Sequence, residues 1–169
     1  KDGEECYPGN LHVSVTYTLD HENRLTTVIE AVTDAPTPVN LCNHTYFNLT
    51  GADTSILGHE LTIHASRYTI VNDELIPTGD LPAVANTPMD FTMPHTIGER
   101  ISDVPGGYDH NYVLDKQPGE PGPCAEFYEP STGRTVKILT TQPGVQFYSG
   151  NFLDGSLTGK NGKVYQKHY

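Results

Sequence analysis

The stretch LHVSVTYTL, residues 11–19, decides the fold class. Its apolar and polar side chains alternate without exception. Successive side chains of a strand point to opposite faces, so this pattern predicts a strand with one apolar face. A polar turn, DHEN, follows at residues 20–23, and a second run rich in β-branched residues, RLTTVIEAVT, covers residues 24–33. Together the two runs predict an antiparallel hairpin.

Shorter runs of the same kind continue along the chain. We expect further strands at residues 59–65, 68–71, 111–114, 124–129, 135–141 and 145–149. The chain contains 16 Gly and 13 Pro, many of them in the connections, and no helical periodicity extends beyond two turns. Many strands with turns between them predict an all-β fold, an antiparallel sandwich or barrel. We interpret residues 1–169 as part of a single domain and residues 116–123 as a solvated hairpin loop.

Composition excludes several classes of partner. The net charge is −11, so an acidic surface would repel nucleic acid and anionic membrane. No run approaches the ~20 apolar residues that a membrane-spanning helix needs, and the first residues, KDGEECYPG, do not resemble a signal peptide. Three widely spaced cysteines without a C-x-x-C motif argue against a disulfide framework or a zinc site. Free thiols fit a cytoplasmic protein.

Histidines show no metal-binding pattern either. His59 and His64 are five residues apart on an expected strand, so their side chains would point to opposite faces. We therefore expect no metal site.

The segment VNLCNHTYFNLTG, residues 39–51, is the first candidate for chemistry. It begins as a strand would, with Val39 and Leu41 alternating against polar residues, and we expect the strand to end near His44. One interpretation makes His44 a half-buried histidine that hydrogen-bonds neighbouring backbone. The other makes it a general acid, since imidazole titrates near neutral pH. Tyr46 and Phe47 are expected in the core or as the wall of a site.

Two further segments, GGYDHN at 106–111 and TQPGVQFYSGN at 141–151, place polar residues where expected strands begin or end. Loops at strand ends commonly carry binding groups. Asp109 is either a turn residue or a carboxylate that accepts hydrogen bonds from a pair of sugar hydroxyls. Gln146 either stabilises its loop or contacts a hydroxyl.

At these residues the chain resembles the aldose 1-epimerase (galactose mutarotase) family. VNLCNHTYFNLTG is similar to that family's N-H-[ST]-Y-[FW]-N-L segment. DGEECYPG at 2–9 resembles its DGEEGYPG turn, with Cys6 where the family usually has Gly. The segments NDELIPTGDL, GGYDHNYVL and TTQPGVQFYSGNFLDG follow in the family's order. The resemblance covers essentially the whole chain.

The resemblance implies a large antiparallel β-sandwich that binds sugar in an open cleft. It implies an isomerase that interconverts the α and β anomers of free galactose and glucose without a cofactor. By similarity, His44 would be the catalytic acid that protonates the ring oxygen. Asp109 and Gln146 would bind the sugar, and Tyr46 would shape the wall beside His44.

The same resemblance implies parts outside residues 1–169. The family's base is a glutamate shortly after the segment similar to NGKVYQKHY, and an Arg and another His precede the segment that begins at Lys1. We therefore expect an incomplete sandwich with exposed sheet edges, and little epimerase activity from these residues alone. A hexose-phosphate epimerase is a weaker alternative, because the candidate loops carry almost no basic residues. A non-catalytic sugar-binding module and a ligand-free structural domain remain open.

Overall fold

A computed structural model describes residues 1–169 and contains nine strands and four short 3₁₀ helices. The chain divides into two compact units, Lys1–Tyr46 and Phe47–Tyr169, which are described separately. Every strand pairing is antiparallel. This architecture confirms the all-β prediction; the single-domain interpretation stays a prediction. No helix is long and apolar enough to cross a membrane.

The first unit is built on the predicted hairpin. Strands β1 (Leu11–Leu19) and β2 (Leu25–Thr33) form a two-stranded sheet in which Leu11 faces Thr33 and Leu19 faces Leu25. The 3₁₀ turn η1 (Glu4–Cys6) precedes it. Residues 34–48 contain no strand or helix, so the strand expected before His44 is wrong. Alternation at residues 39–42 was insufficient, because a strand also needs a neighbour with which to pair its backbone.

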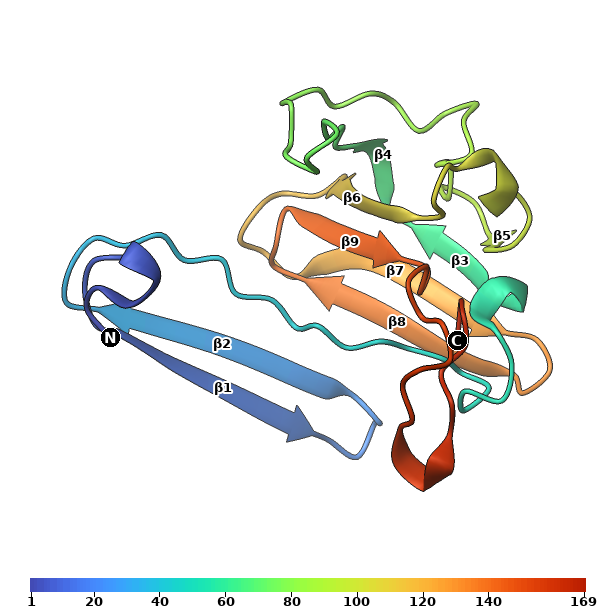
Figure 1. The fold of residues 1–169 in the computed structure, drawn as a ribbon, viewed down its shortest axis with the longest axis horizontal. Coiled ribbons are helices and arrows are strands. Elements are labelled where there is room, and N and C mark those ends of the chain that lie inside the picture. Colours follow the sequence, from blue (N-terminus) through green and yellow to red (C-terminus); the bar gives the residue numbers. More distant parts are fainter. The chain divides into compact units, whose positions relative to one another are not determined.

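The second unit contains two sheets (Figure 1). One has the order β5-β3-β7-β8, and the other has the order β4-β6-β9. Their strands are β3 (Glu60–Ile63), β4 (Ala65–Tyr68), β5 (His95–Thr96), β6 (Asp109–Leu114), β7 (Gly122–Glu129), β8 (Arg134–Thr140) and β9 (Gly144–Tyr148). The remaining 3₁₀ turns are η2 (Ile56–Gly58), η3 (Ile101–Asp103) and η4 (Lys160–Gly162).

One apolar core joins both sheets of the second unit. Leu61 and Ile63 of β3, Tyr112 and Leu114 of β6, and Ala125 of β7 are buried in the same cluster. Alternate residues of these strands face away from the cluster, as a strand's period of two requires. Each sheet therefore has an outer face on which polar side chains can be displayed.

The expected strand at residues 59–65 is two strands that join different sheets. β3 ends at Ile63 and β4 begins at Ala65, and between them the backbone of His64 bonds the carbonyl of Cys124 and the N–H of Asp115. The alternation continues through residue 65 because β3 and β4 both direct apolar residues toward the same core. The pattern therefore does not reveal that one strand ends and another begins at His64. The strand expected at residues 68–71 is wrong beyond Tyr68.

The loop at residues 116–123 is not a hairpin loop. It connects β6 to β7, which belong to different sheets, and Gly122 and Pro123 are already part of β7. Its Gly, Pro and charged residues marked a solvated connection, but composition alone does not say which strands a connection joins.

Candidate functional site

Asp109 and Gln146 meet on the outer face of the β4-β6-β9 sheet. β6 and β9 are neighbours in which Asp109 faces Tyr148 and Asn111 faces Gln146. Because Tyr112 and Leu114 point into the core, Asp109 and Gln146 point away from it and are exposed. The Gln146 amide nitrogen, Nε2, donates a hydrogen bond to Asp109 Oδ1 at 2.8 Å. The structure therefore brings together two of the four predicted site residues.

This hydrogen bond determines what the pair can offer a ligand. One N–H of Gln146 Nε2 is used within the pair, which leaves the second N–H as a donor and the carbonyl oxygen Oε1 as an acceptor. The Asp109 carboxylate can accept further hydrogen bonds. Two adjacent acceptors on an exposed strand face suit a ligand that presents hydroxyl donors.

An aromatic pair that the sequence reasoning did not single out lies beside the polar pair. Tyr148 shares a face with Asp109, and its ring stacks on Phe152 with a centroid separation of 6.1 Å and an interplanar angle of 24°. The backbone N–H of Phe152 donates to the Tyr148 hydroxyl at 3.0 Å, and Phe152 is 80% exposed. The position of Tyr148 in the sequence could have identified it as a neighbour of the site, because Tyr148 lies two residues after Gln146 and therefore on the same face of β9.

His110 supports the start of β6. Its Nδ1 atom accepts a hydrogen bond from the N–H of Asp109 at 3.1 Å, and its ring lies edge-on to Tyr68. Burial lowers the pKa of His110, while the charge of Asp109 opposes this shift. An acceptor nitrogen requires a neutral ring, so the lowered pKa and the hydrogen bond agree.

His44 and Tyr46 lie together in the first unit. Both are exposed, and their ring centroids are 5.5 Å apart at an interplanar angle of 33°. The Asn43 side chain accepts from the Thr45 N–H and hydroxyl at 3.0 and 2.5 Å, which shapes the backbone around His44 without a strand. The interpretation of His44 as a half-buried histidine is wrong.

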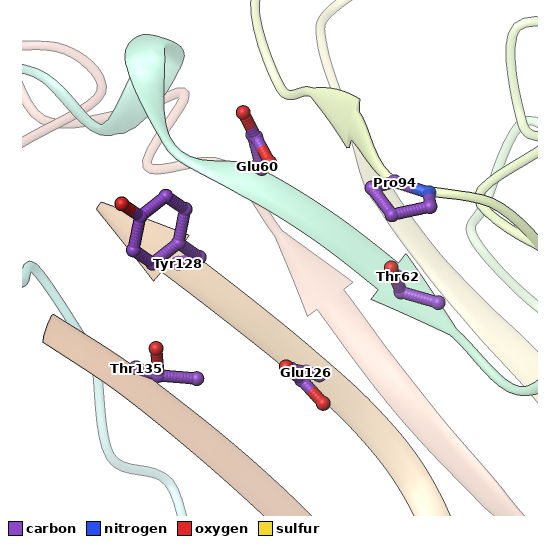
Figure 2. A pocket seen from close by; sticks show the side chains of 6 residues that line it. All are labelled: Glu60, Thr62, Pro94, Glu126, Tyr128 and Thr135. Atoms are coloured by element: carbon purple, nitrogen blue, oxygen red, sulfur yellow. The ribbon is translucent and has the colours of Figure 1, made fainter. Parts of the chain in front are cut away.

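A separate hollow opens on the outer face of the other sheet (Figure 2). It is lined by Glu60, Thr62, Pro94, Glu126, Tyr128 and Thr135. None of the predicted site residues lines it. Within residues 1–169 no group of three His, Cys, Asp or Glu side chains is placed to hold a metal ion.

The family model described as aldose 1-epimerase matches residues 1–169. The chain belongs to the aldose 1-epimerase family. Human galactose mutarotase is 50% identical over 169 residues, covering 99% of this chain and 49% of the human protein. The aldose 1-epimerase of Escherichia coli K12 is 38% identical over 160 residues, covering 92% of this chain and 46% of that protein.

Solved structures of aldose 1-epimerase relatives share the fold. Galactose 1-epimerase from Lactobacillus acidophilus NCFM matches with a TM-score of 0.85 and 30% identity, over 99% of this chain and 49% of that one. An aldose epimerase homologue from C. elegans matches with a TM-score of 0.87 and 28% identity, over 99% of this chain and 51% of that one. The chain thus spans about half the length of the relatives it matches.

Proposed function

We propose that the protein containing this chain is an aldose 1-epimerase that interconverts the α and β anomers of galactose and glucose. The observation that carries the proposal is the 50% identity to human galactose mutarotase along 99% of the chain. The acceptor pair Asp109–Gln146 supports it, because a free hexose presents several hydroxyl donors and no charge.

His44 is proposed to act on the ring oxygen. Ring opening requires a proton on O5 while the proton of the C1 hydroxyl is removed and the C1–O5 bond breaks. The open-chain aldehyde rotates about C1–C2, and O5 attacks the other face of C1. The same imidazole takes back its proton during closure. Its exposure leaves the ring accessible to a ligand.

The other site residues are proposed to bind and orient the sugar. Asp109 accepts from hexose hydroxyls, Gln146 contacts the sugar near C1, and Tyr46 forms the wall beside His44. The resemblance places the base, a glutamate, outside residues 1–169, so the test requires the whole protein that contains this chain.

Replacing His44 by Asn removes the proposed acid and keeps a polar side chain. We expect kcat for mutarotation to fall by about 10²- to 10⁴-fold, the usual contribution of positioned proton transfer. Polarimetry of freshly dissolved α-galactose measures the rate, and NMR titration with galactose should show that binding is largely kept. The control is His21→Asn, an exposed histidine in the β1–β2 turn, which should leave the rate unchanged.

The outcomes separate the alternatives. Full activity of His44→Asn would contradict the proposed role of His44. Galactose binding without acceleration by the wild-type protein would favour a sugar-binding module. Neither binding nor acceleration with any aldose would contradict the proposed function altogether.

A further inference from the structure

Three contacts within the second unit hold the backbone just after the NHTY segment. The N–H of Leu49 donates to His59 Nε2 at 3.0 Å, and the carbonyl of Leu49 accepts from Arg134 Nη1 at 2.8 Å. Two residues earlier, the ring of Phe47 packs on Phe127 of β7 at 5.3 Å between centroids. We call His59, Arg134 and Phe127 the Leu49 clamp. Both backbone groups of Leu49 are thus satisfied by side chains.

The two hydrogen-bonding clamp residues, His59 and Arg134, lie at the same end of strands β3, β7 and β8. His59 directly precedes β3, whose first residue Glu60 faces Tyr128, and Arg134 faces Glu129 across β7 and β8. His59 and Arg134 therefore lie on either side of Glu129. Leu49 has no strand partner, and the two side chains supply the donor and the acceptor that a neighbouring strand would supply.

The protonation state of His59 suits this contact. His59 is only 2% exposed, and because its Nε2 accepts a hydrogen bond the ring must be neutral. Burial lowers the pKa of His59, which favours the neutral form, although the charge of Glu129 opposes the shift. The contact requires an acceptor side chain at position 59. A leucine of similar size would leave the Leu49 N–H without a hydrogen-bond partner.

We propose that His59 and Arg134 are positioning residues for the epimerase reaction and act through His44. This inference rests on the proposed function. Phe47 is three positions after His44, so their backbones are at most about 11 Å apart. The clamp belongs to the same compact unit as Asp109 and Gln146. The clamp therefore fixes the backbone of Leu49, which lies five positions along the chain from the proposed acid.

The test compares variants that break the clamp with variants that keep its hydrogen bonds. His59→Leu removes the acceptor and Arg134→Met removes the donor, whereas His59→Gln and Arg134→Lys keep them. In the whole protein we expect each clamp-breaking variant to lower kcat by about 10- to 100-fold, the usual effect of misplacing a catalytic group. KM for galactose should change by less than about 3-fold, because Asp109 and Gln146 lie on other strands. The conservative variants should recover most of the rate.

A core variant controls for general loss of stability. Ile138→Ala shortens a side chain of β8 that packs on the core and makes no clamp contact. Assayed well below the melting temperature, it should keep kcat. Amide hydrogen exchange provides the second readout. The exchange rate of the Leu49 N–H should rise in His59→Leu and should stay at the wild-type value in Ile138→Ala.

Each outcome decides the inference. If His59→Leu and Arg134→Met lose no more kcat than Ile138→Ala, the clamp is structural only and the inference is wrong. If His59→Leu does not fold, Arg134→Met still tests the clamp, because the Arg134 side chain is exposed. If the wild-type protein does not accelerate mutarotation, the proposed function is wrong and the positioning role falls with it.

Discussion

Cys6 adopts a left-handed backbone conformation, with φ at 68°, inside the turn that precedes β1. A side chain at Cβ crowds the following carbonyl in this conformation, at a cost of roughly 1–2 kcal/mol, and glycine avoids it. The resemblance of DGEECYPG to the aldose 1-epimerase family's turn implies Gly at the position of Cys6. The structure now supplies the physical reason for that preference.

Replacing Cys6 by Gly should therefore stabilise the turn. We expect a gain of about 0.5–1 kcal/mol in the free energy of unfolding, because the relief of strain exceeds the extra entropy of an unfolded glycine. Urea denaturation measures it. Cys6→Ser is the matched control, since it removes the thiol but keeps Cβ. An equal gain from Cys6→Ser would show that the thiol, rather than the backbone, is the cause.

At the scale of single elements, the β7–β8 hairpin shows how a turn is stabilised by a buried carboxylate. Glu129 ends β7 and is 6% exposed. It accepts hydrogen bonds from the N–H of Thr132 at 2.7 Å and from the N–H and hydroxyl of Ser131 at 3.0 and 2.9 Å. The hydrogen bonds from Thr132 and Ser131 lower the pKa of Glu129 to about 2.

This lowered pKa predicts acid sensitivity. The unfolded glutamate has a pKa near 4.5, so below that pH the unfolded chain takes up a proton that the folded state resists. The contribution of Glu129 to stability is complete above pH 4.5 and should be lost as the pH falls toward 2. Urea unfolding of wild type and Glu129→Gln measures it: the variant should be less stable at pH 6 and show a smaller decline in acid.

The control for this pH dependence is Glu126→Gln. Glu126 is a β7 carboxylate that is partly exposed and paired with Lys137 at 2.9 Å. The stability of Glu126→Gln should depend on pH nearly as that of wild type does, because exposed ion pairs contribute little to stability. If the stability of wild type and of Glu129→Gln fell in parallel as the pH is lowered, Glu129 would not be the source of the acid sensitivity.

At the scale of the whole molecule, burial is distributed unevenly between the two units. In the first unit only Gly9 is buried, and large apolar side chains of both strands, including Val15, Tyr17 and Val32, are exposed. The second unit contains the entire buried core. A two-stranded sheet is by itself only marginally stable. The two units should therefore differ in local stability.

Hydrogen exchange of a polypeptide consisting of residues 1–169 tests this difference. Amides of β1 and β2 should exchange faster than those of β3 and β7, because little apolar burial opposes their opening. Ile63→Ala should accelerate exchange in β3 and β7 and leave β1 and β2 unchanged. Equal protection of the hairpin and the core strands would be the contrary result.

The sequence by itself determined the all-β class, the β1–β2 hairpin and the approximate positions of the strands from β6 to β9. These features depend on side-chain alternation and turn residues, which are local properties. It also identified Asp109 and Gln146 as candidates, but not their contact, because they are 37 residues apart. Only the tertiary structure decided that β6 lies beside β9, that the chain changes sheets at His64, and that Leu49 is held by His59 and Arg134. Pairing and side-chain clamps depend on which distant segments meet, and alternation contains no information about that choice.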